Sequence, residues 1–172
     1  SVLPYNELGA AAAAYHADEK ELCRLDEIYS AAKTPFEIRS GSEKVTRRFF
    51  KICNNGRESF TGLYKSLTEQ GICKGHQCIA YGLYIRDNGI ELSEGLAVYG
   101  YSICSAIVTN CVKLVPLSQL AGQKILGESF ELISSASEKA LFTDINDIGI
   151  SGAGFDLRAM QHEQLYSRQY MS

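Results

Sequence analysis

Apolar residues recur at helical spacing along most of the chain. Leu22, Leu25 and Tyr29 lie three or four residues apart, and the same period runs through residues 36–52 and 60–67. Such a period places the apolar side chains on one face of a helix. No convincing run alternates apolar and polar residues as a strand would. The pattern therefore predicts an all-α fold, a single-domain bundle of about seven helices with a flexible C-terminal arm.

Local signals predict where some of these helices begin and end. Thr34, Pro35 and Glu37 have the order of a capping box, so a helix is expected to start with Thr34 as its cap. A sixth, uncharged helix is expected to run to about Leu114, before Pro116 interrupts it because proline lacks an N–H. A long seventh helix is expected to follow. The residues expected on its inward side are Leu120, Ile125, Leu132 and Ile133.

The character of the chain changes after Asp144. Residues 148–155 are uncharged and rich in glycine, and residues 156–172 mix polar side chains with tyrosines. We therefore expect the helical bundle to span residues 1–148. A glycine hinge and a C-terminal interaction arm are expected to span residues 149–172.

The composition is that of an ordinary globular protein. The chain has 172 residues, a formal net charge of −3 and 45% apolar residues. The mildly acidic balance argues against a nucleic-acid partner, which normally requires a basic excess. The first residues have no cationic start and no long apolar core, so no secretory signal is expected. The six cysteines are therefore expected to be reduced thiols in a cytoplasmic protein.

An uncharged stretch at residues 95–112 just reaches the length of a membrane span. It also holds Ser102, Ser105 and Thr109, whose small polar side chains share one face of a helix, and Asn110 follows them. These polar residues favour a buried central helix over a membrane helix. Packing within the core is the expected role of the small-residue face.

One segment carries soft metal ligands close together. Cys73, His76 and Cys78 fall within six residues, and two thiolates with an imidazole could hold zinc, nickel or copper. A stable site normally needs a fourth ligand, and no second cluster of cysteine and histidine supplies it. A loop with incidental cysteines is expected here. Direct nickel binding by these three residues is the alternative.

Two further segments resemble catalytic motifs without completing them. His162 and Glu163 begin as a zinc-protease motif does, but Tyr166 stands where the second histidine would be. Residues 149–154 are rich in glycine but lack the lysine and hydroxyl residue that end a phosphate-binding loop. We therefore expect no cofactor and no enzymatic activity.

Two C-terminal segments resemble the urease accessory protein UreF family. The first is Val-Lys-Leu-Val-Pro-Leu-Ser-Gln at 112–119, followed by Gly-Gln-Lys-Ile-Leu at 122–126. The second is the ending at 160–172, with its His-Glu-Gln-Leu-Tyr-Ser-Arg core. Less specific matches extend the resemblance over nearly the whole chain. Family members begin with a further helical segment, so this chain is expected to start after it.

The resemblance implies a non-catalytic, all-helical homodimer that promotes nickel insertion into apo-urease. Its implied partners are UreD, also called UreH, and the GTPase UreG, with neither nucleic acid nor membrane. The C-terminal arm is expected to contact UreD/UreH, and the end of the uncharged helix to meet UreG. The residues expected in the first contact are His162, Glu163, Tyr166, Ser167, Arg168 and Tyr170, and those in the second are Lys113, Asn110 and Gln119.

Overall fold

The computed structural model describes residues 2–53, 56, 58–150 and 152–166, and over these residues it contains helices and no strands. The all-α prediction is confirmed, but this part of the chain forms nine α-helices rather than about seven. Two short 3₁₀ turns, η1 (Leu3–Tyr5) and η2 (Ile145–Asp147), flank them. The α-helices are α1 (Glu7–His16), α2 (Glu19–Ala32), α3 (Phe36–Ile52), α4 (Phe60–Glu69), α5 (Gln77–Asp87), α6 (Leu92–Leu114), α7 (Gln119–Glu128), α8 (Phe130–Ala140) and α9 (Ala153–His162).

Two features account for the larger number of helices. The expected long seventh helix is divided at Ser129 into α7 and α8, and the Ser129 hydroxyl donates to the Ile125 carbonyl at 2.8 Å. A serine that bonds back to the preceding turn in this way bends a helix. In addition, α9 forms within the expected arm.

The inward face predicted for the seventh helix is largely wrong. Ile133 is buried, but Leu120, Ile125 and Leu132 are exposed. Leu126 is the residue of α7 that turns inward instead, because the bend at residue 129 changes which side of the chain faces the core.

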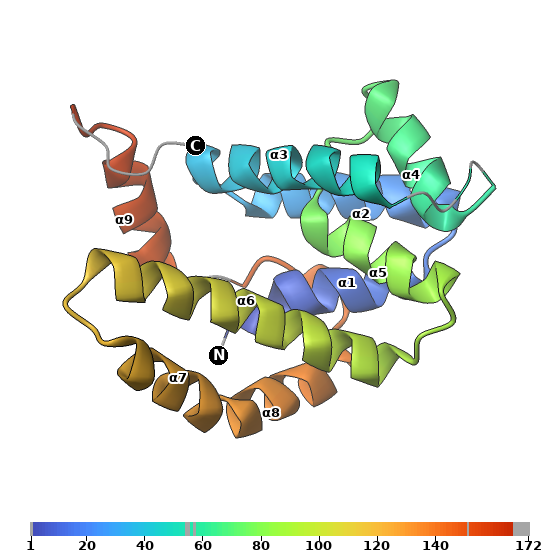
Figure 1. The fold of residues 1–172 in the computed structure, drawn as a ribbon. Helices are drawn as coiled ribbons and strands as arrows, with labels where there is room; N and C mark the ends of the chain where they lie inside the picture. The colour runs from blue at the N-terminus through green and yellow to red at the C-terminus, as the bar shows by residue number, and fades with distance from the viewer. Residues whose placement is uncertain (1, 54–55, 57, 151, 167–172) are drawn as a thin grey trace.

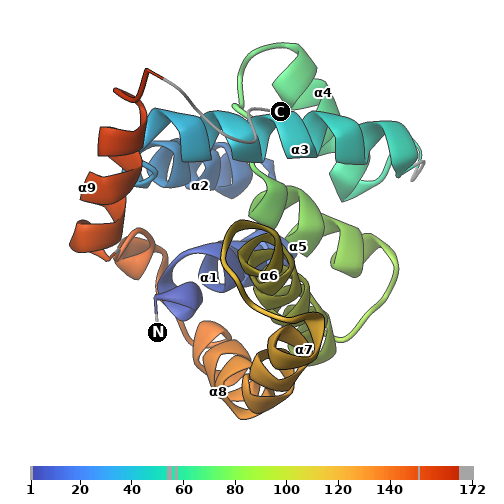
Figure 2. The same ribbon diagram turned by 60° about the vertical axis from the view of Figure 1, so that its left-hand side comes forward.

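Helix α1 lies at the centre of the molecule. Figures 1 and 2 show α2, α3 and α4 on one side of α1 and α5, with α6, α7 and α8 on the other. Helix α1 contacts α2, α5, α6 and α8. It can be surrounded in this way because Ala10, Ala11 and Ala14, which are fully buried, leave little side chain between the helix axes.

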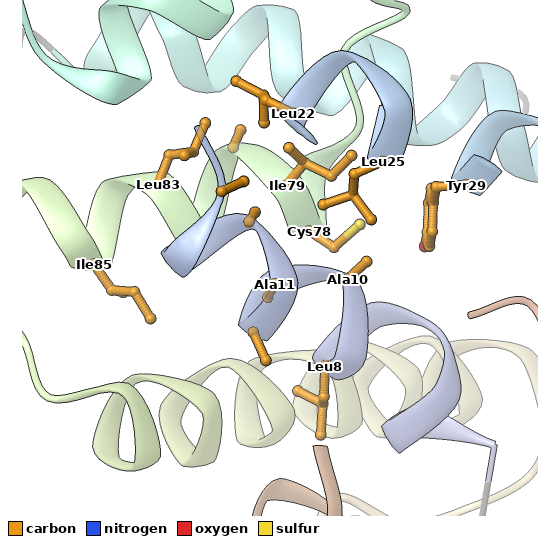
Figure 3. Packing of buried hydrophobic residues seen from close by; sticks show 14 of the residues in the cluster. Leu8, Ala10, Ala11, Leu22, Leu25, Tyr29, Cys78, Ile79, Leu83 and Ile85 are labelled. Atoms are coloured by element: carbon orange, nitrogen blue, oxygen red, sulfur yellow. The ribbon is translucent and has the colours of Figure 1, made fainter. Parts of the chain in front are cut away.

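The core forms where α1, α2 and α5 meet. Leu25, Ile79 and Leu83 are at most 1% exposed at this junction, and Figure 3 shows Leu25 and Ile79 next to each other. Leu8, which is also fully buried, lies on the other side of α1, toward α6. Burying each such side chain contributes roughly 1.5–3 kcal/mol. Gly82 lets α5 approach α1 most closely, because a Cβ at this position would lie 2.2 Å from the Ala11 carbonyl oxygen.

Helix α6 is not the buried central helix that its lack of charge predicted. Its first turns pack into the core through Leu96 and Tyr99, but Ser102 and Thr109 are exposed and Ser105 is only half-buried. Only 22% of its most apolar window is buried. The prediction of burial was therefore wrong for most of this helix, since the described part of the chain leaves its second half largely uncovered.

The beginning of α3 also differs from the prediction. Thr34 does not cap the helix, which starts at Phe36 after Pro35, a residue with no hydrogen-bonding side chain. The Phe36 N–H donates instead to Glu163 Oε1 at 2.8 Å, and Glu163 directly follows α9. A carboxylate from far along the chain therefore takes the role expected of the local threonine.

Candidate functional site

The three candidate metal ligands have separate neighbours. Cys73 Sγ lies 3.9 Å from Cys23 Sγ, His76 Nε2 lies 2.7 Å from Ser30 Oγ, and Cys78 lies beside Tyr29. Over the residues that the structure covers, no group of three or more His, Cys, Asp or Glu side chains is close enough to hold a metal ion. Cys73, His76 and Cys78 are thus close in sequence but do not converge on one point.

A buried carboxylate connects the elements around this segment. Asp26 on α2 is 2% exposed. It accepts hydrogen bonds from the Tyr64 hydroxyl at 2.5 Å, the Lys74 N–H at 2.7 Å and the Gly75 N–H at 3.1 Å. The Tyr64 hydroxyl in turn accepts the His76 N–H at 2.8 Å. This cluster joins α2, α4 and the connection to α5, and both Asp26 oxygens accept hydrogen bonds from the protein itself.

Sequence reasoning missed this cluster, although a signal was present. Asp26 follows Leu22 by four residues and precedes Tyr29 by three, so it falls on the apolar face of α2. A charged residue on a buried face is normally paired. The pattern could have indicated a buried carboxylate, but it could not have identified Tyr64 and residues 74–75 as the donors.

His76 is fully buried, and only one of its two ring nitrogens has a hydrogen-bond partner among the described residues. Its Nε2 meets Ser30 Oγ, its ring packs edge-on against Tyr29 at 4.9 Å, and Nδ1 has no hydrogen-bond partner among the described residues. Burial lowers the pKa of His76 to about 4, although the nearby Asp26 carboxylate acts in the opposite direction. The ring is therefore neutral at physiological pH, because burial disfavours its charged form more than the Asp26 carboxylate favours it.

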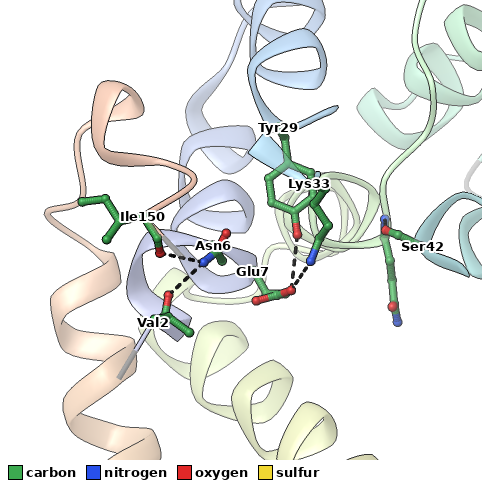
Figure 4. Close-up of polar contacts among 8 residues, drawn as sticks. Val2, Asn6, Glu7, Tyr29, Lys33, Ser42 and Ile150 are labelled. Carbon is green, nitrogen blue, oxygen red and sulfur yellow. Dashed lines mark hydrogen bonds and ion pairs between the residues drawn. The ribbon is translucent and has the colours of Figure 1, made fainter. Parts of the chain in front are cut away.

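A cavity of about 320 Å³ opens between α3 and α6 beside Glu7, the first residue of α1. Its polar lining is internally paired: the Lys33 ammonium forms an ion pair with the Glu7 carboxylate, and the Tyr29 hydroxyl donates to Glu7 Oε1 at 3.4 Å (Figure 4). Ile38, Val45 and other apolar side chains make up most of the remaining wall. The arrangement can seat an apolar group, but it presents no activated nucleophile.

The described part of the expected arm folds back onto α3. Helix α9 stands at one edge of the molecule against the start of α3 (Figures 1 and 2). His162 Nδ1 lies 2.6 Å from Glu37 Oε2, Glu163 accepts the Phe36 N–H, and Tyr166 is fully exposed. Ser167, Arg168 and Tyr170 lie outside the described residues. His162 and Glu163 therefore both contact the start of α3 within the same chain.

The second set of predicted partner residues lies at the corner between α6 and α7. Asn110 and Lys113 are exposed on the last turns of α6, and Gln119 is exposed at the first position of α7. The two helices are held together here because Gly122 packs directly against Val112. The fold therefore brings these three polar residues to one end of the molecule, where each is open to solvent.

Beside this corner, α6 carries an open face of small and apolar residues. A shallow hollow along the helix is lined by Val98, Tyr101, Ser102, Ser105, Ala106, Thr109 and Asn110. Val98 is 62% exposed although it is a large apolar residue. We call these seven residues the open α6 face. Small side chains on an exposed helix let another helix approach closely, so this face has the form of an interface.

Within the described ranges, α6 is the one helix long and apolar enough to cross a membrane. Length and composition alone give only weak evidence of a span. The first turns of α6 pack against α1 and α5, and the helix carries polar side chains on its open face.

Comparison with known proteins gives a consistent result. The family model described as UreF matches residues 2–129. A urease accessory protein UreF from Actinobacillus pleuropneumoniae is 34% identical over 169 residues, covering 98% of this chain and 74% of the relative. A urease accessory protein UreF from Paenarthrobacter aurescens is 30% identical, covering 86% of this chain and 67% of the relative. One from Streptococcus thermophilus is 28% identical, covering 86% of this chain and 62% of the relative. This chain belongs to the UreF family.

Proposed function

We propose that this chain is a non-catalytic, cytoplasmic accessory protein of urease maturation. Together with UreD/UreH it recruits and regulates the GTPase UreG, so that nickel is inserted into apo-urease. The observation that carries the proposal is membership of the UreF family over nearly the whole chain, since the relatives are named urease accessory proteins. A protein that works by presenting surfaces needs no cofactor of its own.

Two regions are the proposed docking sites for these partners. The residues following α9 contact UreD/UreH, because tyrosine and arginine are enriched at binding hot spots and this segment holds Tyr166, Arg168 and Tyr170. The corner formed by Asn110, Lys113 and Gln119 meets UreG. The exposure of the corner residues supports this assignment, since a GTPase could reach them without any rearrangement of the core.

A third surface is proposed to form a homodimer. The open α6 face combines small residues with exposed Val98 and Tyr101, and nothing in the described part of the chain covers it. A second copy of α6 could pack there with its axis close to the first. Such an interface would bury the uncharged helix that is mostly exposed in a single copy.

The central test is reconstituted urease activation. Apo-urease is incubated with UreD/UreH, UreG, GTP and Ni²⁺, with and without this chain, and both urease activity and GTP hydrolysis are followed. We expect urease activity to depend on this chain and the GTPase rate to change on its addition. Equal activation with and without the chain would refute the proposal.

The arm is tested by co-purification with UreD/UreH. Deletion of residues 161–172 should abolish co-purification, and Arg168→Ala should weaken it while helix content stays the same. Arg158→Ala is the matched control, since Arg158 lies on α9 and its guanidinium donates to the Gln161 side chain at 3.0 Å. Normal recovery of UreD/UreH with the deleted chain would rule out the arm as the docking segment.

A further inference from the structure

Two cysteines from different elements lie almost within bonding distance. Cys23 is on α2, Cys73 is in the connection between α4 and α5, and their sulfur atoms are 3.9 Å apart. A disulfide requires about 2.05 Å between sulfurs, so they must approach by only about 2 Å, which side-chain rotation can supply. All six cysteines are free thiols in this structure.

The backbone around Cys73 holds its thiol in this position. The N–H groups of Ile72 and Cys73 both donate to the Leu67 carbonyl, at 3.0 and 3.2 Å. The next two N–H groups, at residues 74 and 75, donate to the Asp26 carboxylate. Asp26 lies on α2 one turn after Cys23. The same helix therefore carries one sulfur and anchors the loop that carries the other.

The two thiols differ in access to solvent. Cys23 is half-buried and lines two surface hollows, one of them about 510 Å³ in volume. Cys73 is only 2% exposed, and burial, reinforced by the nearby Asp26 carboxylate and Cys23, raises its pKa. A small oxidant therefore reaches Cys23 first, and Cys73 is placed to act second.

We propose that Cys23 and Cys73 form a reversible disulfide when the protein meets a peroxide, and that this bond staples α2 to the connection between α4 and α5. The inference concerns residues outside the proposed docking surfaces and does not depend on the proposed function. The other four cysteines are not part of the site.

The reaction balances with hydrogen peroxide as the oxidant. The Cys23 thiolate attacks one peroxide oxygen, the O–O bond breaks, and Cys23 becomes a sulfenic acid as one water is formed. Cys73 loses its proton to solvent and attacks the Cys23 sulfur. The S–S bond forms while the S–O bond breaks, and hydroxide leaves as a second water. In total, two thiols and one peroxide give one disulfide and two waters.

The experiment treats the full chain with hydrogen peroxide, blocks remaining thiols by alkylation, and maps tryptic peptides without reduction. Cleavage at lysine and arginine gives peptides 21–24 and 66–74, each with a single cysteine. We expect these two peptides to be joined, and the thiols measured in denaturant to fall from six per chain to four. Because the bond closes a loop of about 50 residues, Tm should rise by roughly 5–10 °C and return to its starting value after reduction.

Two variants separate this pair from general oxidation. Cys73→Ala should leave Cys23 as a sulfenic acid that dimedone traps, with no rise in Tm. Cys104→Ala is the matched control and should cross-link as the unmodified chain does. The proposal fails if Cys23 is oxidised while peptides 21–24 and 66–74 stay separate, or if Cys23 pairs with any other cysteine.

Discussion

At the scale of single residues, Asp26 determines how three elements meet. Its two oxygens accept from Tyr64, Lys74 and Gly75, and through the Tyr64 hydroxyl the cluster reaches the N–H that precedes α5. These donors are buried or nearly so, and an unpaired buried donor costs about 1–3 kcal/mol. Much of the fixed position of the α4–α5 connection therefore depends on one carboxylate.

Replacing this carboxylate should be costly. Asp26→Ala leaves three donors unpaired and should lower the free energy of unfolding by at least about 3 kcal/mol in urea titrations. Asp26→Asn keeps the size and one acceptor oxygen, so it should cost about half as much. Equal stability of the two variants would contradict the benefit expected from the acceptor oxygen that asparagine keeps.

His76 predicts a pH dependence of stability. Its pKa is about 4 in the folded chain and 6.5 when exposed, so the unfolded chain binds more protons between these values. Stability from this residue is complete above pH 6.5 and is lost as the pH falls toward 4, by about 2 kcal/mol between pH 7 and pH 5. Urea titrations at these two pH values measure the loss.

The matched comparison uses two histidine variants. His76→Gln should show a smaller loss between pH 7 and pH 5, whereas the exposed His16→Gln should keep the full loss. Identical pH profiles for all three proteins would show that His76 is not buried as a neutral ring.

At the scale of elements, close packing of α1 and α5 depends on the absence of a side chain. Gly82→Ala would place a Cβ 2.2 Å from the Ala11 carbonyl oxygen, and α1 cannot move away because three other helices and two 3₁₀ turns also contact it. We expect a loss of about 3 kcal/mol or more. Gly127→Ala on α7 meets open space and should instead gain about 0.5–1 kcal/mol. Equal effects in urea titrations would contradict this packing.

The attachment of α9 gives a second prediction at this scale. Among its described residues none is buried, so its position depends on the polar contacts of His162 and Glu163 with α3. His162→Ala/Glu163→Ala should speed amide hydrogen exchange in α9 and the first turn of α3 at least about tenfold, with exchange in α1 unchanged. Gln161→Ala/Gln164→Ala is the control and should leave exchange near its original rate.

The elements also show what the sequence could predict. Helical class and most helix positions follow from local period, which needs only neighbours three or four residues apart. The cap on α3 could not be predicted, because Glu163 lies 127 residues from Phe36. The same limit applies to the donors of Asp26. For α6, lack of charge predicted burial wrongly, because a run of uncharged residues does not say whether the same chain covers it.

At the scale of the whole molecule, one side of the fold is a well-covered apolar core and the other side is an exposed face of α6. The alanine-rich α1 and its neighbours form a core in which large apolar residues are fully covered. On the other side, α6 extends beyond the core and exposes Val98, Tyr101 and Ile107. A protein with a stable core does not need this face for folding, so stability and association should respond to different substitutions.

Ala106→Arg tests whether stability and association respond to different substitutions. Ala106 is exposed on the open α6 face, and its side chain is a single methyl group. Two such faces cannot pack around a long charged residue, so the proposed dimer of about 38 kDa, twice 18.9 kDa, should dissociate to single chains in size-exclusion chromatography with light scattering. Tm should fall only as far as the lost association requires. Ala31→Arg makes the same change at an exposed position of α2 and should leave the dimer intact.

If the unmodified chain elutes at 18.9 kDa at every concentration, the open α6 face serves a different partner, and Ala106→Arg should then weaken binding to UreD/UreH or UreG instead.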